Sequence, residues 1–158
     1  VSLTMEIKTS RSIARQILRH RSFSFQEFSQ RYSNKWVPSE LSEVRLQDEK
    51  NRQNSISVNN KELSDWWNTT QIDTVMIAIK MYEEAINKGI AKEVARNVLP
   101  EGLTQSTMYM AGTLRSWIHY CQLRTGNGTQ LEHQQIAREC WKIISEQFPS
   151  ISGLINID

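Results

Sequence analysis

The hydrophobic pattern changes from a period of two residues to a helical period within residues 1–21, VSLTMEIKTSRSIARQILRHR. From Val1 to Lys8, apolar and polar residues alternate strictly, which is the pattern of a β-strand with one buried face. After Thr9 or Ser10, either of which can cap a helix, apolar residues recur at helical spacing until about Arg21. This stretch therefore predicts a strand that leads directly into an α-helix.

The predicted opening strand needs neighbours, because a single strand is not stable alone. The other strand candidates, Glu43 to Gln47 and Ser55 to Val58, are short and weak, and the first residue is not methionine. We therefore expect the other strands of the sheet to lie mostly upstream, in an N-terminal segment that this sequence lacks.

The helix that follows the strand contains a charge in an unusual place. At 100° per residue, Arg21 projects into the apolar sector that Ile13, Ala14, Ile17 and Leu18 form. An unpaired charge in such a sector is costly. We therefore expect either that Arg21 has an anionic partner or that the helix ends there.

The rest of the chain predicts mainly helices. The polar stretch from Ser33 to Asn68 predicts a long irregular excursion. Helical spacing then predicts three helices, at about Thr70 to Lys88, Ala91 to Leu99 and Thr107 to Arg124, with Gly89 directly after the first. A fourth helix begins at a capping box formed by Thr129 and Glu132 and ends before Pro149. Together these elements predict one helix-rich domain of the α+β class over residues 1–158.

Composition limits the class of protein. The 158 residues, 39% of them apolar, fit one domain with a real core, and a net charge of +2 argues against a general polyanion binder. No apolar run is long enough to span a membrane, and the start lacks a secretory signal, so we expect a cytoplasmic protein. Cys121 and Cys140 have no CxxC spacing and the three histidines are scattered, so we expect neither a disulfide nor a metal site.

The densest group of chemically active residues is RHRSFSFQEFSQRY, residues 19–32. Its arginines can hold phosphate oxygens bidentately, and its serine hydroxyls can add neutral donors, so it predicts an anion site. Two other interpretations stay open on spacing alone. The segment could be a solvated basic helix end, or a nucleic-acid patch in which Phe23, Phe25 and Phe28 stack on bases.

The same segment resembles the signature of the flavin-dependent thymidylate synthases, the ThyX family. The signature residues in place are Arg19, His20, Arg21, Ser24, Glu27, Ser29, Arg31 and Tyr32. Gln26 stands where the commonest form of the family has Asn, one methylene shorter. Further matching stretches cover nearly the whole chain: Ile7-Lys8-Thr9, Arg15-Gln16, Ala95-Arg96, Leu99-Pro100, Leu114 to Trp117, His119 to Arg124 and Asn127 to His133.

The resemblance implies an enzyme that methylates dUMP to dTMP. Methylenetetrahydrofolate would donate the carbon, and FAD reduced by NADPH would carry the hydride. The family fold is α+β, and the family works as a homotetramer whose active sites are shared between subunits, with no nucleic-acid or membrane partner. The family also begins with several dozen residues, including flavin contacts, that this sequence does not contain.

The resemblance also implies roles for individual residues. Those expected to bind the nucleotide are Gln16, Arg19, Glu27, Ser29, Gln30, Arg31, Arg96 and Arg124. Arg124 is the expected catalytic residue, because a cation beside the uracil favours ionisation at N3. Those expected to bind FAD are Arg19, His20, Arg21, Glu27, Thr113, Leu114, Arg115 and His119.

Several of these residues also have structural interpretations. Arg96 could pair with Glu93 on its own helix, and Arg115 and His119 are spaced like any solvated helix face. A basic nucleic-acid-binding module and a non-catalytic homologue are the alternative functions. Cys121 and Cys140 lie among apolar helix positions, so we expect buried, inert thiols and no covalent bond to the pyrimidine.

Overall fold

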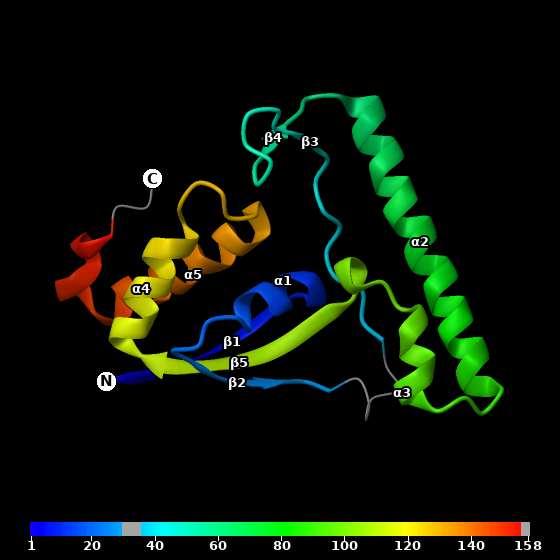
Figure 1. Cartoon of the computed structure of the whole chain (residues 1–158), viewed down its shortest axis with the longest axis horizontal. Helices are drawn as coiled ribbons and strands as arrows, with labels where there is room; N and C mark the ends of the chain where they lie inside the picture. Colours follow the sequence, from blue (N-terminus) through cyan, green and yellow to red (C-terminus); the bar gives the residue numbers. More distant parts are fainter. Residues whose placement is uncertain (30–35, 156–158) are drawn as a thin grey trace.

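The computed structural model describes residues 1–29 and 36–155 of the chain. A three-stranded antiparallel sheet in the order β1-β5-β2 lies against three helices, and a separate two-stranded sheet pairs β3 with β4 (Figure 1). The strands are β1 (Ser2–Ser10), β2 (Ser24–Glu27), β3 (Arg45–Gln47), β4 (Ser55–Ser57) and β5 (Gln105–Thr113). The helices are α1 (Arg11–Ile17), α2 (Lys61–Asn87), α3 (Lys92–Ala95), α4 (Leu114–Arg124) and α5 (Leu131–Gln147), with short 3-10 turns η1 (Arg96–Val98), η2 (Glu101–Leu103) and η3 (Pro149–Leu154). The expected α+β class is confirmed.

β5 is the central strand of the larger sheet. It pairs with β1 along its whole length, from Ser2 opposite Thr113 to Ser10 opposite Gln105. Its other edge pairs with β2, which lies inside the signature segment. Along β5, Met108 and Met110 are fully buried, because successive side chains of a strand point to opposite faces.

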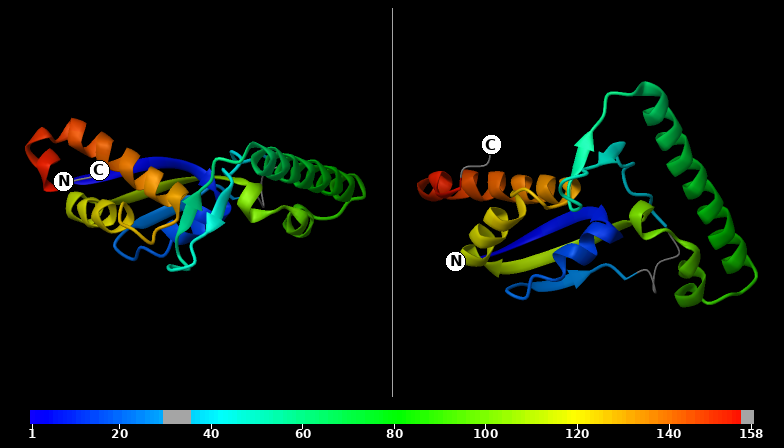
Figure 2. Two further views of the ribbon diagram at one scale, coloured as in Figure 1. Left: turned by 90° about the horizontal axis from the view of Figure 1, so that it is seen from above. Right: turned by 45° about the horizontal axis from the view of Figure 1, so that its top comes forward.

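The core lies between this sheet and helices α1, α4 and α5. Its buried apolar residues include Ile7 and Met110 from the sheet and Trp117 from α4. Figures 1 and 2 show α4 and α5 side by side over one end of the sheet, while α2 runs along the other side of the molecule. Among the described residues, no helix is both long and apolar enough to cross a membrane.

One expectation about the sheet is wrong. Residues 105–113 form β5, whereas we expected a helix from Thr107. Apolar residues at 108, 110, 111 and 114 fit either period, and pairing with β1 and β2 decides for the strand. The opening strand consequently pairs within this chain with β5, which was not among the strand candidates that the sequence predicts.

The first helix is shorter than its apolar spacing indicates. α1 ends at Ile17, and a tight turn follows in which the His20 N–H donates to the Ile17 carbonyl at 3.1 Å. Ser10 caps the start, as expected, and accepts a bond from the Ile13 N–H. The helix therefore ends before Arg21, which is one of the two outcomes expected for that charge, and Arg21 is exposed beyond it.

Other helix boundaries also differ from expectation. α2 begins at Lys61, nine residues before Thr70, because Asn60 caps it by accepting a bond from the Leu63 N–H. α5 begins after Gln130 without a side-chain cap, so the expected capping box of Thr129 and Glu132 is wrong. Three expectations are confirmed: short strands at β3 and β4, Gly89 directly after the C-cap residue of α2, where it has a positive φ, and a short helix, α3 with η1, within residues 91–99.

Gly112 marks a close approach between the sheet and the signature segment. A Cβ atom at Gly112 would lie 2.5 Å from Cδ1 of Phe23. The Phe23 ring is in turn packed edge-on against Trp117, with centroids 4.9 Å apart. The absence of a side chain at Gly112 thus lets Phe23 dock residues 18–23 onto β5 and α4.

We expect Gly112→Ala to lower the free energy of unfolding by about 1–3 kcal/mol, because the methyl group overpacks the Phe23 ring. This loss should exceed the gain of about 0.4–1 kcal/mol that Gly-to-Ala replacement gives through the unfolded chain. Gly102→Ala is the matched control, since nothing lies within 4 Å of its Cβ position. Urea unfolding at fixed protein concentration measures both, and equal stability of the two variants would contradict the packing argument.

Candidate active site

The turn after α1 meets the end of α4. The Nε–H of Arg124 donates to Nε2 of His20 at 2.8 Å. The His20 ring lies edge-on to the Tyr120 ring at 4.9 Å between centroids, and to the His133 ring at 6.3 Å. The fold thus joins His20 of the signature to Arg124, 104 residues later in the chain.

Local structure in α4 explains the position of Arg124. Thr113 caps the helix, because its hydroxyl accepts a bond from the Ser116 N–H at 3.2 Å. Trp117 and Tyr120 are fully buried, so this face of α4 is fixed against the core. Arg124 follows Tyr120 by four residues and therefore lies above it on the same face.

His133 connects α5 to this cluster. It is completely buried, with Nε2 lying 3.1 Å from the Tyr120 hydroxyl and Nδ1 lying 3.4 Å from Oε1 of Gln16. Gln16, an expected nucleotide contact, also donates from Nε2 to Oε1 of Gln130 at 2.8 Å. The site therefore draws on α1, α4 and α5 together.

His133 is a site residue that sequence reasoning missed. The buried positions of α5 are His133, Ala137, Cys140, Trp141 and Ile144. A histidine on an otherwise apolar helical stripe is the signal that could have identified it. Tyr120 carries the same signal on α4, where it lies on the buried stripe with Trp117 and Cys121.

Burial and positive charge keep both histidines neutral. Burial, together with the charges of Arg124 and His119, lowers the pKa of His20 to about 4. Burial likewise lowers the pKa of His133 to about 4, with help from Arg124 and His20. Burial also raises the pKa of Tyr120, so its hydroxyl keeps its proton. Because His20 accepts at Nε2, its proton is on Nδ1.

We expect the free energy of unfolding to fall as the pH drops from about 6.5 toward 4, because the unfolded histidines bind protons in that range while the folded ones stay neutral. His133→Gln should weaken this dependence. Gln122→Asn, at an exposed position of α4, is the control that should preserve it. Urea unfolding at several pH values measures the slope, and an unchanged slope in His133→Gln would contradict the assignment.

The remaining expected flavin contacts are mostly exposed. Arg19 and Arg21 lie on the surface of the turn after α1, so Arg19 is not on the helix with Gln16 as we expected. Arg115 and His119 are exposed one turn apart on α4, and the Leu114 N–H donates to the Val1 carbonyl. Within residues 1–29 and 36–155, no carboxylate forms an ion pair with Arg19, Arg21 or Arg115. These guanidinium groups are therefore suited to a ligand with anionic phosphates.

The expected phosphate contacts lie further away. Glu27 in β2 accepts a bond from the Ser106 hydroxyl and lies 3.9 Å from Nη1 of Arg11, and Ser29 follows just after the strand. Arg96 donates from Nε to the backbone carbonyl of Glu93, a local contact that differs from the side-chain pair with Glu93 given as its structural interpretation. Figure 1 shows α3, which directly precedes Arg96, far from α4, so one chain does not bring Arg96 to the His20 cluster. Gln30 and Arg31 lie outside the described residues.

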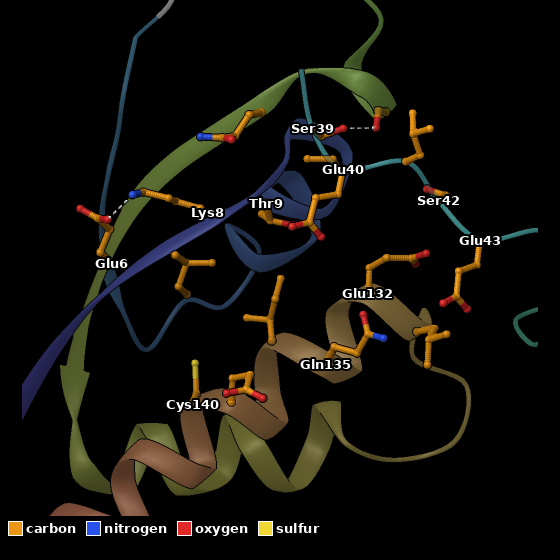
Figure 3. A pocket seen from close by; sticks show the side chains of 18 of the residues that line it. Glu6, Lys8, Thr9, Ser39, Glu40, Ser42, Glu43, Glu132, Gln135 and Cys140 are labelled. Atoms are coloured by element: carbon orange, nitrogen blue, oxygen red, sulfur yellow. Dashed lines mark hydrogen bonds and ion pairs between the residues drawn. The ribbon is translucent and has the colours of Figure 1, made fainter. Parts of the chain in front are cut away.

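A pocket of about 610 Å³ lies between β1, residues 39–45 and α5 (Figure 3). None of the expected site residues lines it. Glu132 and Arg45 do, and Nη2 of Arg45 donates to Oε1 of Glu132 at 2.6 Å. Figure 3 shows Glu40 and Glu43 near Glu132 at this wall. The sequence predicts Glu132 in a capping box and in the matching stretch Asn127 to His133, but not as part of a pocket wall.

The two cysteines are buried in the core, as expected. Burial raises the pKa of Cys121, and it raises the pKa of Cys140 to about 12. Neither thiol is therefore a thiolate at neutral pH, and neither is an activated nucleophile.

The family model described as "Thymidylate synthase complementing protein" (Thy1) matches residues 1–150. The chain belongs to this family. It is 50% identical over 154 residues to the "Probable flavin-dependent thymidylate synthase" of Paramecium bursaria Chlorella virus 1, covering 98% of this chain and 71% of that protein. It is 48% identical over 155 residues to the "Flavin-dependent thymidylate synthase" of Synechocystis sp. PCC 6803, with the same two coverages. The resemblance seen in the signature is thereby confirmed.

The fold is also found in solved structures. The crystal structure of a UMP/dUMP methylase, PolB from Streptomyces cacaoi, bound with 5-Br UMP, superposes with a TM-score of 0.83 at 23% identity. The match covers 94% of this chain and 70% of that one. This Thy1-family chain therefore shares its α+β architecture with a protein that has diverged widely in sequence.

Proposed function

We propose that this Thy1-family chain is the catalytic domain of a flavin-dependent thymidylate synthase that methylates dUMP to dTMP. The observation that carries the proposal is the Arg124 side chain held against neutral His20, inside a family member whose relatives are named for this activity. Methylenetetrahydrofolate supplies the carbon and leaves as tetrahydrofolate. We place the reaction in the cytoplasm.

Arg124 is proposed to bind the uracil edge of dUMP and to act as the catalytic residue. His20 accepts a bond from Nε of Arg124 without neutralising it, because the His20 imidazole is an uncharged acceptor. The full positive charge therefore remains to stabilise a pyrimidine that becomes anionic at N3. Such stabilisation is strongest where water is excluded, and the half-buried position of Arg124 above Tyr120 favours it.

The proposed flavin contacts are Arg19, His20, Arg21, Glu27, Thr113, Leu114, Arg115 and His119. When bound, FAD reduced by NADPH supplies the hydride. The three arginines of this set have no carboxylate partner within the described ranges, which suits them to a pyrophosphate. His119, four residues after Arg115, extends the same exposed face of α4.

We further propose that the nucleotide site is completed by other copies of the chain, in a homotetramer. Arg96 and Arg124 are both proposed nucleotide contacts, yet α3 and α4 lie far apart in Figure 1. Helix α2, next to η1, exposes a row of large apolar side chains: Trp66, Ile72, Met76, Ile77 and Met81. A patch of this kind supports association, and a partner seated on α2 would be close to Arg96.

We expect Arg124→Ala to reduce dTMP formation roughly 10²- to 10³-fold, because one transition-state partner of the pyrimidine is lost. Arg124→Lys should restore only part of the lost dTMP formation, since an ammonium group cannot form the planar bidentate contact of a guanidinium. Lys142→Ala, at an exposed position of α5, is the control. Each variant is assayed with its flavin absorbance recorded, and parental turnover in flavin-loaded Arg124→Ala would refute the assignment.

We expect charges on α2 to break the assembly. Met76→Lys with Ile77→Lys places two cations on the exposed apolar row and should yield a smaller species with little dTMP formation. Asp73→Asn, an exposed polar change on the same helix, should leave both properties intact. Analytical ultracentrifugation of the enzyme measures the mass, and an active, undiminished oligomer in the double variant would contradict the shared-site proposal.

The alternative functions are separated by simple measurements. A nucleic-acid-binding module would show oligonucleotide affinity that falls steeply with salt. A non-catalytic homologue would assemble as an oligomer without forming dTMP. The net charge of +2 and the family membership favour neither of these two alternative functions.

A further inference from the structure

A continuous line of hydrogen bonds runs from the pocket of Figure 3 to the His20 cluster. It begins at Glu132, whose Oε1 accepts from Arg45 and whose Oε2 accepts from Nε2 of Gln130 at 2.9 Å. It continues from Gln130 to Gln16 at 2.8 Å, from Gln16 to His133 at 3.4 Å, and from His133 to Tyr120 at 3.1 Å. We call these bonds the Glu132–Tyr120 relay.

The charge of Glu132 determines the direction of every bond in the relay. An ionised carboxylate can only accept, so Gln130 must turn its amide nitrogen to Glu132 and its oxygen to Gln16. Gln16 must then turn its nitrogen to Gln130 and its oxygen to His133. His133 is consequently protonated on Nδ1, and its Nε2 accepts the Tyr120 hydroxyl proton.

The structure keeps Glu132 ionised. Burial alone would raise its pKa, but hydrogen bonds from Arg45, the backbone and Gln130 outweigh burial and lower the pKa below its ordinary value. Arg45 is mostly buried beside it and carries a permanent charge. Glu132 also lies in the first turn of α5, where the helix dipole favours a negative charge.

We propose that Glu132 is a positioning residue, which through the Glu132–Tyr120 relay holds the Gln16 amide with its N–H groups toward the nucleotide. This rests on the proposed function and on the nucleotide contact that the family resemblance implies for Gln16. Gln130 takes one N–H of the Gln16 amide, and the other remains for a carbonyl or phosphate oxygen of the ligand. A reversed relay would present the amide oxygen, which repels such acceptors.

The first test measures the tautomer of His133 in the full chain without any nucleotide. Nitrogen-15 NMR of labelled histidine distinguishes a proton on Nδ1 from one on Nε2, and His133→Asn identifies the signal. We expect Nδ1–H in the parent and a mixed or Nε2–H state in Glu132→Gln, whose amide can donate as well as accept. Glu139→Gln, an exposed change on α5, should keep the parental tautomer.

The second test measures dUMP binding. Glu132→Gln should weaken it roughly three- to tenfold, as expected for one hydrogen bond. Gln130→Met interrupts the relay at an exposed position and leaves the Arg45–Glu132 ion pair intact, so it should act similarly even if Glu132→Gln does not fold.

Three outcomes overturn the proposal. One is an Nε2–H tautomer of His133 in the parent. Another is an unchanged tautomer in Glu132→Gln, and the third is dUMP affinity within twofold of the parent in both relay variants. A parent that does not bind dUMP at all would instead overturn the proposed function, and the positioning role with it.

Discussion

The pairing of β5 with β1 and β2 is the interaction on which the rest of the structure depends, because it joins segments about one hundred residues apart. It places the signature segment, which contains β2, beside the strand that leads into α4. Gly112 then lets Phe23 approach β5 closely enough to pack on Trp117. Without this pairing, His20 and Arg124 would have no reason to meet.

The site depends on a cation kept beside neutral aromatic groups. Arg124 is next to His20 and near His133, and both imidazoles stay uncharged because burial and Arg124 itself oppose their protonation. The Tyr120 ring packs against both histidine rings, with centroids 4.9 Å from His20 and 5.8 Å from His133. Within the described residues, no carboxylate forms an ion pair with Arg124. Its positive charge can therefore attract a negatively charged ligand.

The Arg45–Glu132 ion pair, on the other side of α5, is connected to this site through a series of hydrogen bonds and does not contact it directly. Arg45 and Glu132 face the pocket between β1, residues 39–45 and α5, whereas Gln16 and His133 face the turn after α1. Amide groups between them have one donor side and one acceptor side, so a fixed charge at one end orders the other. The excursion that carries Arg45, which is weakly patterned in sequence, thereby gains a structural role in the site.

The sequence by itself determined the α+β class, the β1–α1 opening, the two thiols as buried and inert, and the family through the residues 19–32 signature. It did so because alternation, capping and motif spacing are local properties. It could not determine β5, since Met108, Met110, Ala111 and Leu114 suit a helix or a strand and only long-range pairing chooses. The His20–Arg124 contact, the Gln16–His133 contact and the Arg45–Glu132 pair were likewise decided by tertiary structure, because each joins residues more than 80 positions apart that come together only when the core forms.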